Sequence, residues 1–235
     1  MIWQRLVLAV FLLSVGVNLW GAVRDPQLWA IPAALAGWYV ADLLSGLIHM
    51  MMDYRPCPPG KGLDQLFFYP GKRGSPEYQA LFREKMQGIN AFERISYDFK
   101  NHHPRPDALG RRSVWRLIGS TVIAGALPLS LAGNVAVWLW PVPGWIMAGY
   151  AALLLGGGFA QYFHGTLHRR ENPWVIRALR RAGLLMTPAA HQVHHDTLKR
   201  DFATNCGWSN PVVNRLFLAL RARGRLADAG LEPRS

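Results

Sequence analysis

Residues 28–53 read LWAIPAALAGWYVADLLSGLIHMMMD, an apolar stretch long enough to cross a bilayer as a helix. On a helix, Asp42, Ser45, His49 and Asp53 share one face, because they are three or four residues apart. An ionisable group at membrane depth usually has a specific role. Asp42 therefore either caps a broken helix or pairs with an arginine, or it orients a ligating histidine, and the pattern leaves both interpretations open.

Other apolar segments cover 6–23, 114–132 and 135–163, the last interrupted by Pro141 and Pro143. Together with residues 28–52 they predict about four transmembrane helices in a single all-α domain, 1–235. A cleaved signal peptide is the alternative for residues 6–23, but the apolar core of such a peptide is normally shorter.

The positive charges define the orientation of these segments. Of the 26 Lys and Arg, all but Arg5, Arg24 and Arg116 lie in 54–113 and 169–235. A net charge of +12 could indicate nucleic-acid binding, but a nucleic-acid partner does not explain the long uncharged segments between the basic ones. The positive-inside rule places both basic segments in the cytosol. We therefore expect a multi-pass integral membrane protein, suited to a bacterial inner membrane, with no nucleic-acid partner.

All eight histidines fall in compact groups. Since both basic segments are expected in the cytosol, the second and fourth spans must both end on the cytosolic side. All eight histidines therefore come together at one face of the membrane. Two histidines four residues apart place both imidazoles on one helical face, where a metal can bind them. One such pair is often incidental, but four groups at one face indicate a metal site. The predicted ligands and catalytic residues are His49, His102, His103, His164, His168, His191, His194 and His195, with Asp53 as a further ligand or else a solvated helix end.

The number of candidate ligands indicates more than one ion. A catalytic zinc commonly takes about three protein ligands, so this set exceeds the needs of a single ion and fits two, each with an open position. Imidazole suits iron, zinc, copper and nickel alike. We favour two iron ions with dioxygen, because this combination can attack an unactivated C–H bond of a lipid chain. Cys57 and Cys206 are the only cysteines, which leaves no cysteine-rich metal site.

Four motifs resemble the lipid desaturases of the Kua/CarF type, the plasmanylethanolamine desaturase family. They are DLLSGLIHMMMD (42–53), NHHPRPDAL (101–109), QYFHGTLH (161–168) and HQVHH (191–195) followed by NCGWSN (205–210). The resemblance implies a four-span helical enzyme whose cytosolic helical cap carries a di-iron site formed by the same histidines, with Asp53 as a participant. It implies a membrane lipid desaturase that uses O2, most directly forming the vinyl-ether bond of plasmalogens from an alkyl-ether phospholipid. In two respects the chain departs from the family: the segment 54–100 looks longer, and Asn101 stands where an acidic residue often precedes the histidine pair.

Several alternatives stay open. The same metal centre could serve an acyl-chain desaturase or hydroxylase, a zinc could serve a membrane lipid hydrolase, and a non-enzymatic haem or metal carrier would also use histidines. No flavin or haem motif is visible, so we expect an external electron donor, a cytochrome b5-like or ferredoxin-like protein. Arg177, Arg180 and Arg181 could form its docking site. The pattern of segment 54–100 predicts an amphipathic helix near 78–86, and we find no residues in this segment that indicate a chemical role.

Overall fold

Helices make up the regular structure of the part of the chain that a computed structural model describes, residues 2–235, and it contains no strand. Three of the helical stretches are long and apolar enough to cross a membrane, and a bent pair, with an angle of 51°, brings the number of candidate spans to four. The predicted all-α membrane architecture is therefore confirmed. The spans are α1 (Ile2–Arg24), α2 (Ala30–Tyr54), the continuous helix formed by α7 (Val114–Thr121), η1 (Val122–Ala126) and α8 (Leu127–Leu139), and the bent pair α9 (Gly144–Gly158) and α10 (Ala160–Leu167).

The predicted boundary between the third and fourth spans is wrong. The third span continues to Leu139, so residues 135–139 belong to it rather than to the fourth. The chain leaves the helix at Trp140 and resumes at Gly144. Pro141 and Pro143 explain this position, because proline disfavours helical geometry in the residue before it and lacks the N–H that a helix interior requires.

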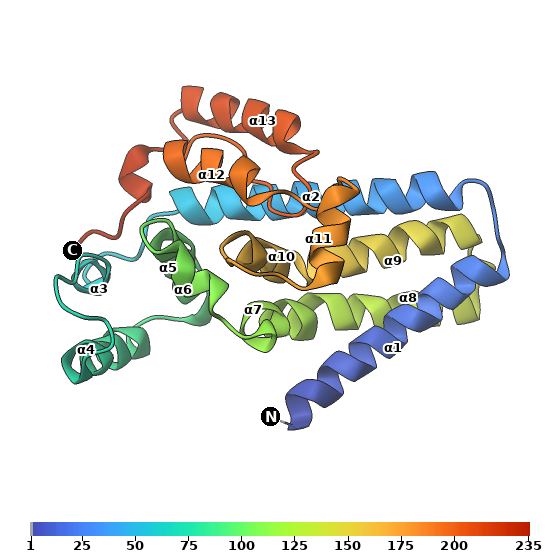
Figure 1. Ribbon diagram of the computed structural model, residues 1–235, viewed down its shortest axis with the longest axis horizontal. Helices are drawn as coiled ribbons and strands as arrows, with labels where there is room; N and C mark the ends of the chain where they lie inside the picture. The colour runs from blue at the N-terminus through green and yellow to red at the C-terminus, as the bar shows by residue number, and fades with distance from the viewer. Residues whose placement is uncertain (1) are drawn as a thin grey trace.

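Small residues allow the spans to pack closely. In Figure 1, α2 lies alongside α9 and α1 crosses α8, and α1 also contacts α9. A Cβ added at Gly37 would lie 2.0 Å from the carbonyl oxygen of Gly149, and one at Gly156 would lie 2.6 Å from Cβ of Ala41. Transmembrane helices approach closely through such residues, because lipid offers little hydrophobic driving force for helix association. Gly156 thus lets α9 approach α2 closely, a short distance before His164 in the chain.

Polar side chains join α1 to α8 inside the spans. The Ser14 and Ser130 hydroxyls lie 2.7 Å apart, Asn18 Nδ2 donates to Ser130 Oγ at 2.9 Å, and Asn134 Nδ2 donates to Ser14 Oγ at 2.8 Å. Hydrogen bonds of this kind hold transmembrane helices together, because lipid provides no competing partners. They fix the two spans that contain no histidine.

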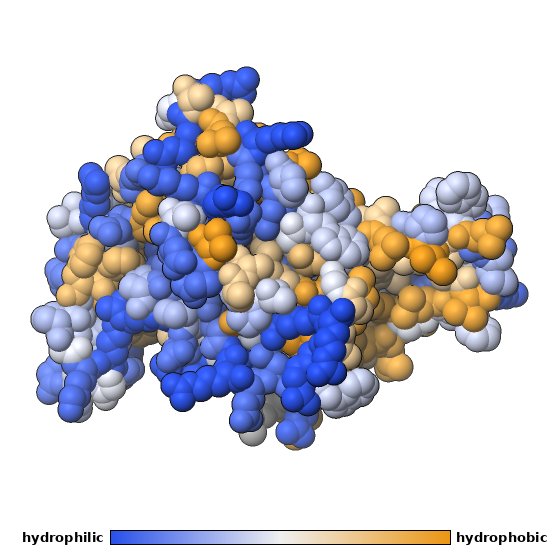
Figure 2. Space-filling view, turned by 45° about the horizontal axis from the view of Figure 1, so that its top comes forward, coloured by the Kyte–Doolittle hydropathy of each residue, from blue (hydrophilic) through white to orange (hydrophobic). Residues whose placement is uncertain are grey.

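The remaining helices form a cap at one end of the spans. Figure 1 shows them around the C-terminal part of α2, while the loops joining α1 to α2 and α8 to α9 lie at the opposite end. Hydrophobic side chains gather over the exposed lengths of the spans, and hydrophilic ones cover the cap (Figure 2). The cap helices are α3 (Leu63–Phe67), α4 (Pro76–Gln87), α5 (Ala91–His102), α6 (Pro106–Gly110), α11 (Trp174–Arg181), α12 (Pro188–Thr197), α13 (Asn210–Ala222) and η2 (Asp228–Gly230).

Candidate metal centre

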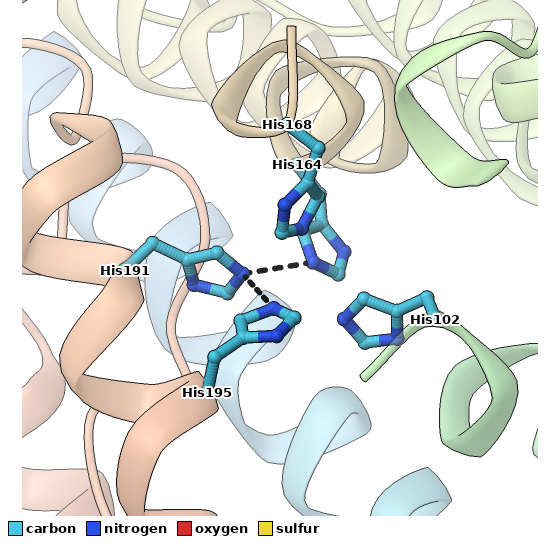
Figure 3. A group of neighbouring side chains, drawn as sticks. All are labelled: His102, His164, His168, His191 and His195. Carbon is cyan, nitrogen blue, oxygen red and sulfur yellow. Dashed lines mark hydrogen bonds between the residues drawn. The ribbon is translucent and has the colours of Figure 1, made fainter. Parts of the chain in front are cut away.

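Five histidines from three elements form the first group of candidate ligands. One ring nitrogen from each lies within 4.8 Å of the others, and their rings surround a common centre (Figure 3). His191 Nε2 is 3.1 Å from His164 Nε2 and 3.2 Å from His195 Nε2. Two imidazole nitrogens at such distances repel each other unless a proton or a cation lies between them. The group consists of His102 at the end of α5, His164 in α10, His168 just after it, and His191 and His195 in α12.

The second group surrounds Asp53. One carboxylate oxygen of Asp53 lies 3.3 Å from Nε2 of both His49 and His194, and the other lies 3.3 Å from Nε2 of His103. The Asp53 side chain is fully buried, and neither oxygen has a hydrogen-bond partner. The interpretation of Asp53 as a solvated helix end is therefore wrong. A buried carboxylate facing three imidazoles is a donor set that fits a cation.

The two groups are adjacent. His102 and His103 follow each other in the chain yet belong to different groups, and their ring centroids are 4.3 Å apart. On α12, His191 and His195 belong to the first group while His194 belongs to the second. The ring centroids of His49 and His164 are 4.9 Å apart. The structure thus brings together all the residues that the sequence predicted for the site.

Backbone carbonyls orient three of the rings. His49 Nδ1 lies 2.9 Å from Phe202 O, His194 Nδ1 lies 2.8 Å from Arg200 O, and His102 Nδ1 contacts Phe99 O. A carbonyl only accepts, so Nδ1 carries the proton and Nε2 keeps its lone pair. Nε2 of each of these rings is buried without a hydrogen-bond partner, as are those of His103 and His168. Buried nitrogens with free lone pairs fit a bound metal, which would satisfy them.

Burial also keeps the imidazoles neutral. In the cap, desolvation and the neighbouring rings His195 and His194 lower the pKa of His168 to about 3. Desolvation and the nearby His194 lower the pKa of His195 to about 4. The pKa values of His102, His103 and His191 are also lowered, chiefly by burial. Since a metal binds neutral imidazole, the site is in its binding form at neutral pH.

Asp42 holds the loop between α12 and α13. Its carboxylate accepts hydrogen bonds from the backbone N–H of Cys206 at 2.8 Å, from Gly207 at 3.0 Å, and from Ser209 through both N–H at 2.9 Å and hydroxyl at 2.7 Å. None of these partners is a histidine or an arginine. The interpretations that Asp42 pairs with an arginine or directly orients a ligating histidine are therefore wrong. Its role resembles capping, because it satisfies backbone donors. The same loop carries Phe202, whose carbonyl orients His49.

Lys100 is a buried cation that sequence reasoning missed. Its Nζ donates to the carbonyl oxygens of Met52 at 3.1 Å and Gly230 at 2.5 Å, and also to that of Asp53. It therefore caps the C-terminal end of α2, where helix carbonyls lack partners. Asn101 beside it accepts hydrogen bonds from Arg73 and Arg105, at 2.9 and 3.2 Å. The Asn101 amide thus holds two arginines of the cap. The set of candidate metal ligands is the same with Asn101 in place of an acidic residue.

The prediction that segment 54–100 carries no chemistry is incomplete. Its last part forms α5, which lines a cavity of about 490 Å³ next to His102 and His164. The sequence contains a signal for this helix, because Asn90 and Glu93 form a capping box and apolar residues recur at Phe92, Ile95 and Phe99. The amphipathic helix expected at 78–86 is also present, as α4 (Pro76–Gln87).

The arginines expected to dock an electron donor differ in their exposure. Arg180 is half-buried and donates to Met186 O and Thr166 Oγ1, both at 2.9 Å, so it holds α11 against the core. Arg177 and Arg181 are exposed. Of the predicted docking residues, Arg177 and Arg181 therefore have side chains open to a partner.

The fold and the site together define a class: helical membrane proteins with adjacent histidine groups that could hold metal ions. Comparison with known families makes this specific, because a lipid desaturase domain matches residues 90–234. The chain belongs to this family of lipid desaturases, so it is a membrane lipid desaturase, an oxidoreductase, and the Kua/CarF-type resemblance is confirmed.

A relative supports the same assignment over a longer stretch. The plasmanylethanolamine desaturase of Myxococcus xanthus is 24% identical over 229 residues, which cover 92% of this chain and 68% of the relative. His49 and Asp53 lie outside the matched family domain, but Asp53 lies 3.3 Å from His103 and His194 within it, and the His49 and His194 ring centroids are 4.6 Å apart. No solved structure matches the chain.

Proposed function

We propose that the protein holds two iron ions in the two ligand groups and uses O2 to form the vinyl-ether bond of plasmalogens from alkyl-ether phospholipid. One observation carries this proposal: two adjacent groups of histidines, with the buried Asp53, contain unpartnered nitrogen and oxygen atoms, and His102 and His164 of the first group line a largely apolar cavity. A lipid chain in such a cavity would end beside two of the residues that would hold the metal. The relative in Myxococcus xanthus, named for plasmanylethanolamine, supports the choice of substrate.

The iron pair, when bound, would activate O2 to remove two hydrogen atoms from adjacent carbons. These two hydrogens, two protons and two electrons from the donor balance the reduction of O2 to two molecules of water. The protein contributes position and environment. The carbonyls of Phe99, Arg200 and Phe202 keep the Nε2 atoms turned inward, and Asp53 supplies the negative charge of one group. Burial keeps bulk water from the ligands.

The electrons come from a separate cytochrome b5-like or ferredoxin-like protein in this proposal. Arg177 and Arg181 form an exposed basic surface on α11, close in sequence to the histidines of α12. An acidic carrier would be attracted to it. The concentration of Lys and Arg in the cap segments supports a cytoplasmic orientation in a bacterial inner membrane.

Reconstitution tests the proposal directly. Purified protein in liposomes containing alkyl-ether phosphatidylethanolamine receives a reductase and carrier, and elemental analysis, O2 uptake and acid-labile vinyl ether are measured. We expect two iron ions per chain and vinyl ether formed only with O2. A hydroxylated or unsaturated acyl product would instead favour the hydroxylase or acyl-chain desaturase. Zinc in place of iron, with O2-independent release of fatty acid, would favour the hydrolase, and metal binding without any lipid product would favour a carrier.

A further inference from the structure

The cavity beside the histidines has a polarity gradient. Its inner end is formed by His102 and His164, both at most 3% exposed. Its walls are largely apolar and come from α2, α5 and α7, including Ile48, Phe99 and Leu117. Such a space accepts a hydrocarbon chain, because apolar walls lose no hydrogen bonds when the chain displaces water.

Three arginines lie at the outer end of this cavity. Arg94 on α5 and Arg116 on α7 are exposed, and Arg112, just before α7, is half-buried. Arg112 forms an ion pair with Asp98 at 3.1 Å, whereas Arg94 and Arg116 form no ion pair within residues 2–235. The rim therefore has an excess of positive charge. Guanidinium groups bind phosphate strongly, through paired charge-assisted hydrogen bonds.

The position of Arg116 relative to the membrane agrees with this. It lies in the first turn of the candidate span Val114–Leu139, and the ends of a span of this length reach the headgroup region of a bilayer, where lipid phosphates are found. It is also one of the few Lys and Arg outside the two basic segments of the sequence. A cation at the end of a span, beside an apolar cavity, is placed to meet a lipid headgroup.

We propose that Arg94, Arg112 and Arg116 bind the phosphate of a membrane glycerophospholipid, one hydrocarbon chain of which enters the cavity between α5 and α7 and ends near His102 and His164. The phospholipid of the proposed function is thus held by its headgroup phosphate, a contact that a free fatty acid cannot make. The headgroup anchor fixes which carbons of the chain reach the histidines. The inference rests on the proposed function for the reaction of that chain, but the binding itself requires no turnover.

A binding measurement tests the arginines. Wild-type protein and the variants Arg94→Gln, Arg112→Gln and Arg116→Gln, in detergent micelles, are titrated with phosphatidylethanolamine that carries a pyrene-labelled chain. We expect each variant to bind about tenfold more weakly, as for the loss of one charge-assisted hydrogen bond, and to keep its metal. In turnover, KM should rise by a similar factor while kcat changes little.

The matched control is Arg111→Gln. Arg111 is next to Arg112, its side chain is 75% exposed, it pairs with Asp107 at 3.6 Å, and it does not line the cavity. It should bind the probe like wild type. Arg116 has no ion pair to lose, so its variant keeps the test informative even if Arg112→Gln unfolds. Unchanged binding by Arg94→Gln and Arg116→Gln would overturn the proposal.

A second experiment blocks the cavity itself. Thr121 lines the cavity, whereas Ala124, one turn further along the same span, is exposed and does not line it. Thr121→Trp should abolish probe binding and Ala124→Trp should leave it unchanged, with equal metal content in both.

Competition identifies the ligand: lysophosphatidylethanolamine should displace the probe, and oleate should not. Equal displacement by oleate would contradict phosphate recognition. Bound phospholipid without any vinyl-ether product would refute the proposed function and not this inference.

Discussion

At the scale of single residues, Asp53 is the residue on which the second ligand group depends. It is the one carboxylate among the candidate ligands and lies 3.3 Å from three imidazole nitrogens. Asp53→Asn keeps the shape but removes the charge, and its amide N–H groups cannot bind a metal. For the proposed iron pair, we expect the iron content to fall from about two to about one per chain, because even the loss of a residue that only supports a ligand typically weakens metal binding about 10–100-fold.

The control for this change is Asp107→Asn, whose side chain is 75% exposed, pairs with Arg111 and belongs to neither ligand group. Metal-free Asp53→Asn should unfold at a higher temperature than metal-free wild type, because an unpaired buried carboxylate destabilises a fold. A variant with a merely structural defect would unfold at a lower temperature with or without metal. Retention of two iron ions by Asp53→Asn would show that Asp53 is not a ligand.

Lys100 gives a prediction that concerns pH. Burial lowers its pKa to about 8, against 10.5 for an unperturbed lysine. Between about pH 8 and 10.5 the unfolded chain therefore binds more protons at this lysine than the folded chain does. Below pH 8 the buried charge lowers the stability of the fold, and this cost disappears as the pH rises through the window. We expect Lys100→Met to lower stability by about 2–4 kcal/mol, because buried carbonyls lose their donor.

Thermal unfolding of both proteins between pH 7 and 10.5 provides the measurement. The gap between wild type and Lys100→Met should widen as pH rises above about 8, since only wild type gains stability from this titration. A constant gap would mean that the lysine keeps its ordinary pKa in the folded protein. Lys85→Met serves as the control. Lys85 lies on α4, and its ammonium group is 2.9 Å from the carboxylate of the neighbouring Glu84.

At the scale of elements, the contact between α2 and α9 positions His49 and Asp53 relative to His164. Gly37→Ala would place a methyl group 2.0 Å from the Gly149 carbonyl oxygen, so the helices must separate. We expect this to cost about 1–3 kcal/mol, as other overpacked contacts do, and to reduce metal content. Gly157→Ala is the matched control, because a Cβ there meets nothing within 4 Å. Equal melting temperatures in detergent for the two variants would contradict this role of the close contact.

The loop between α12 and α13 is the second element that sets the site. It is tied to α2 through Asp42 and through Ser45, whose hydroxyl accepts from Thr204 N at 3.1 Å. It carries the carbonyls of Arg200 and Phe202 that orient His194 and His49. Polar residues of α2 thus fix ligand orientation without touching a ligand ring.

At the scale of the whole molecule, the cap and the loops at the other end lie on opposite sides of the apolar spans (Figure 1). Leu28 is 96% exposed in the loop between α1 and α2, and Lys61 is exposed in the cap. In a Cys206→Ser background, Leu28→Cys should react with a membrane-impermeant maleimide in intact cells. Lys61→Cys should react only after the cells are permeabilised, if the cap is cytoplasmic as its positive charge indicates. The reverse pattern would contradict the cytoplasmic orientation.

The sequence by itself determined the helical membrane class and the identity of the candidate ligands. Both follow from local signals: apolar length sets a span, and histidines at three- or four-residue spacing mark a shared helical face. The tertiary structure decided how His102 and His103 divide between two groups, and that Asp53 is buried at the centre of one. It also decided the roles of Asp42 and Lys100, and it formed the cavity beside α5. These depend on contacts between residues up to 167 positions apart, such as Asp42 with Ser209, which no local pattern encodes.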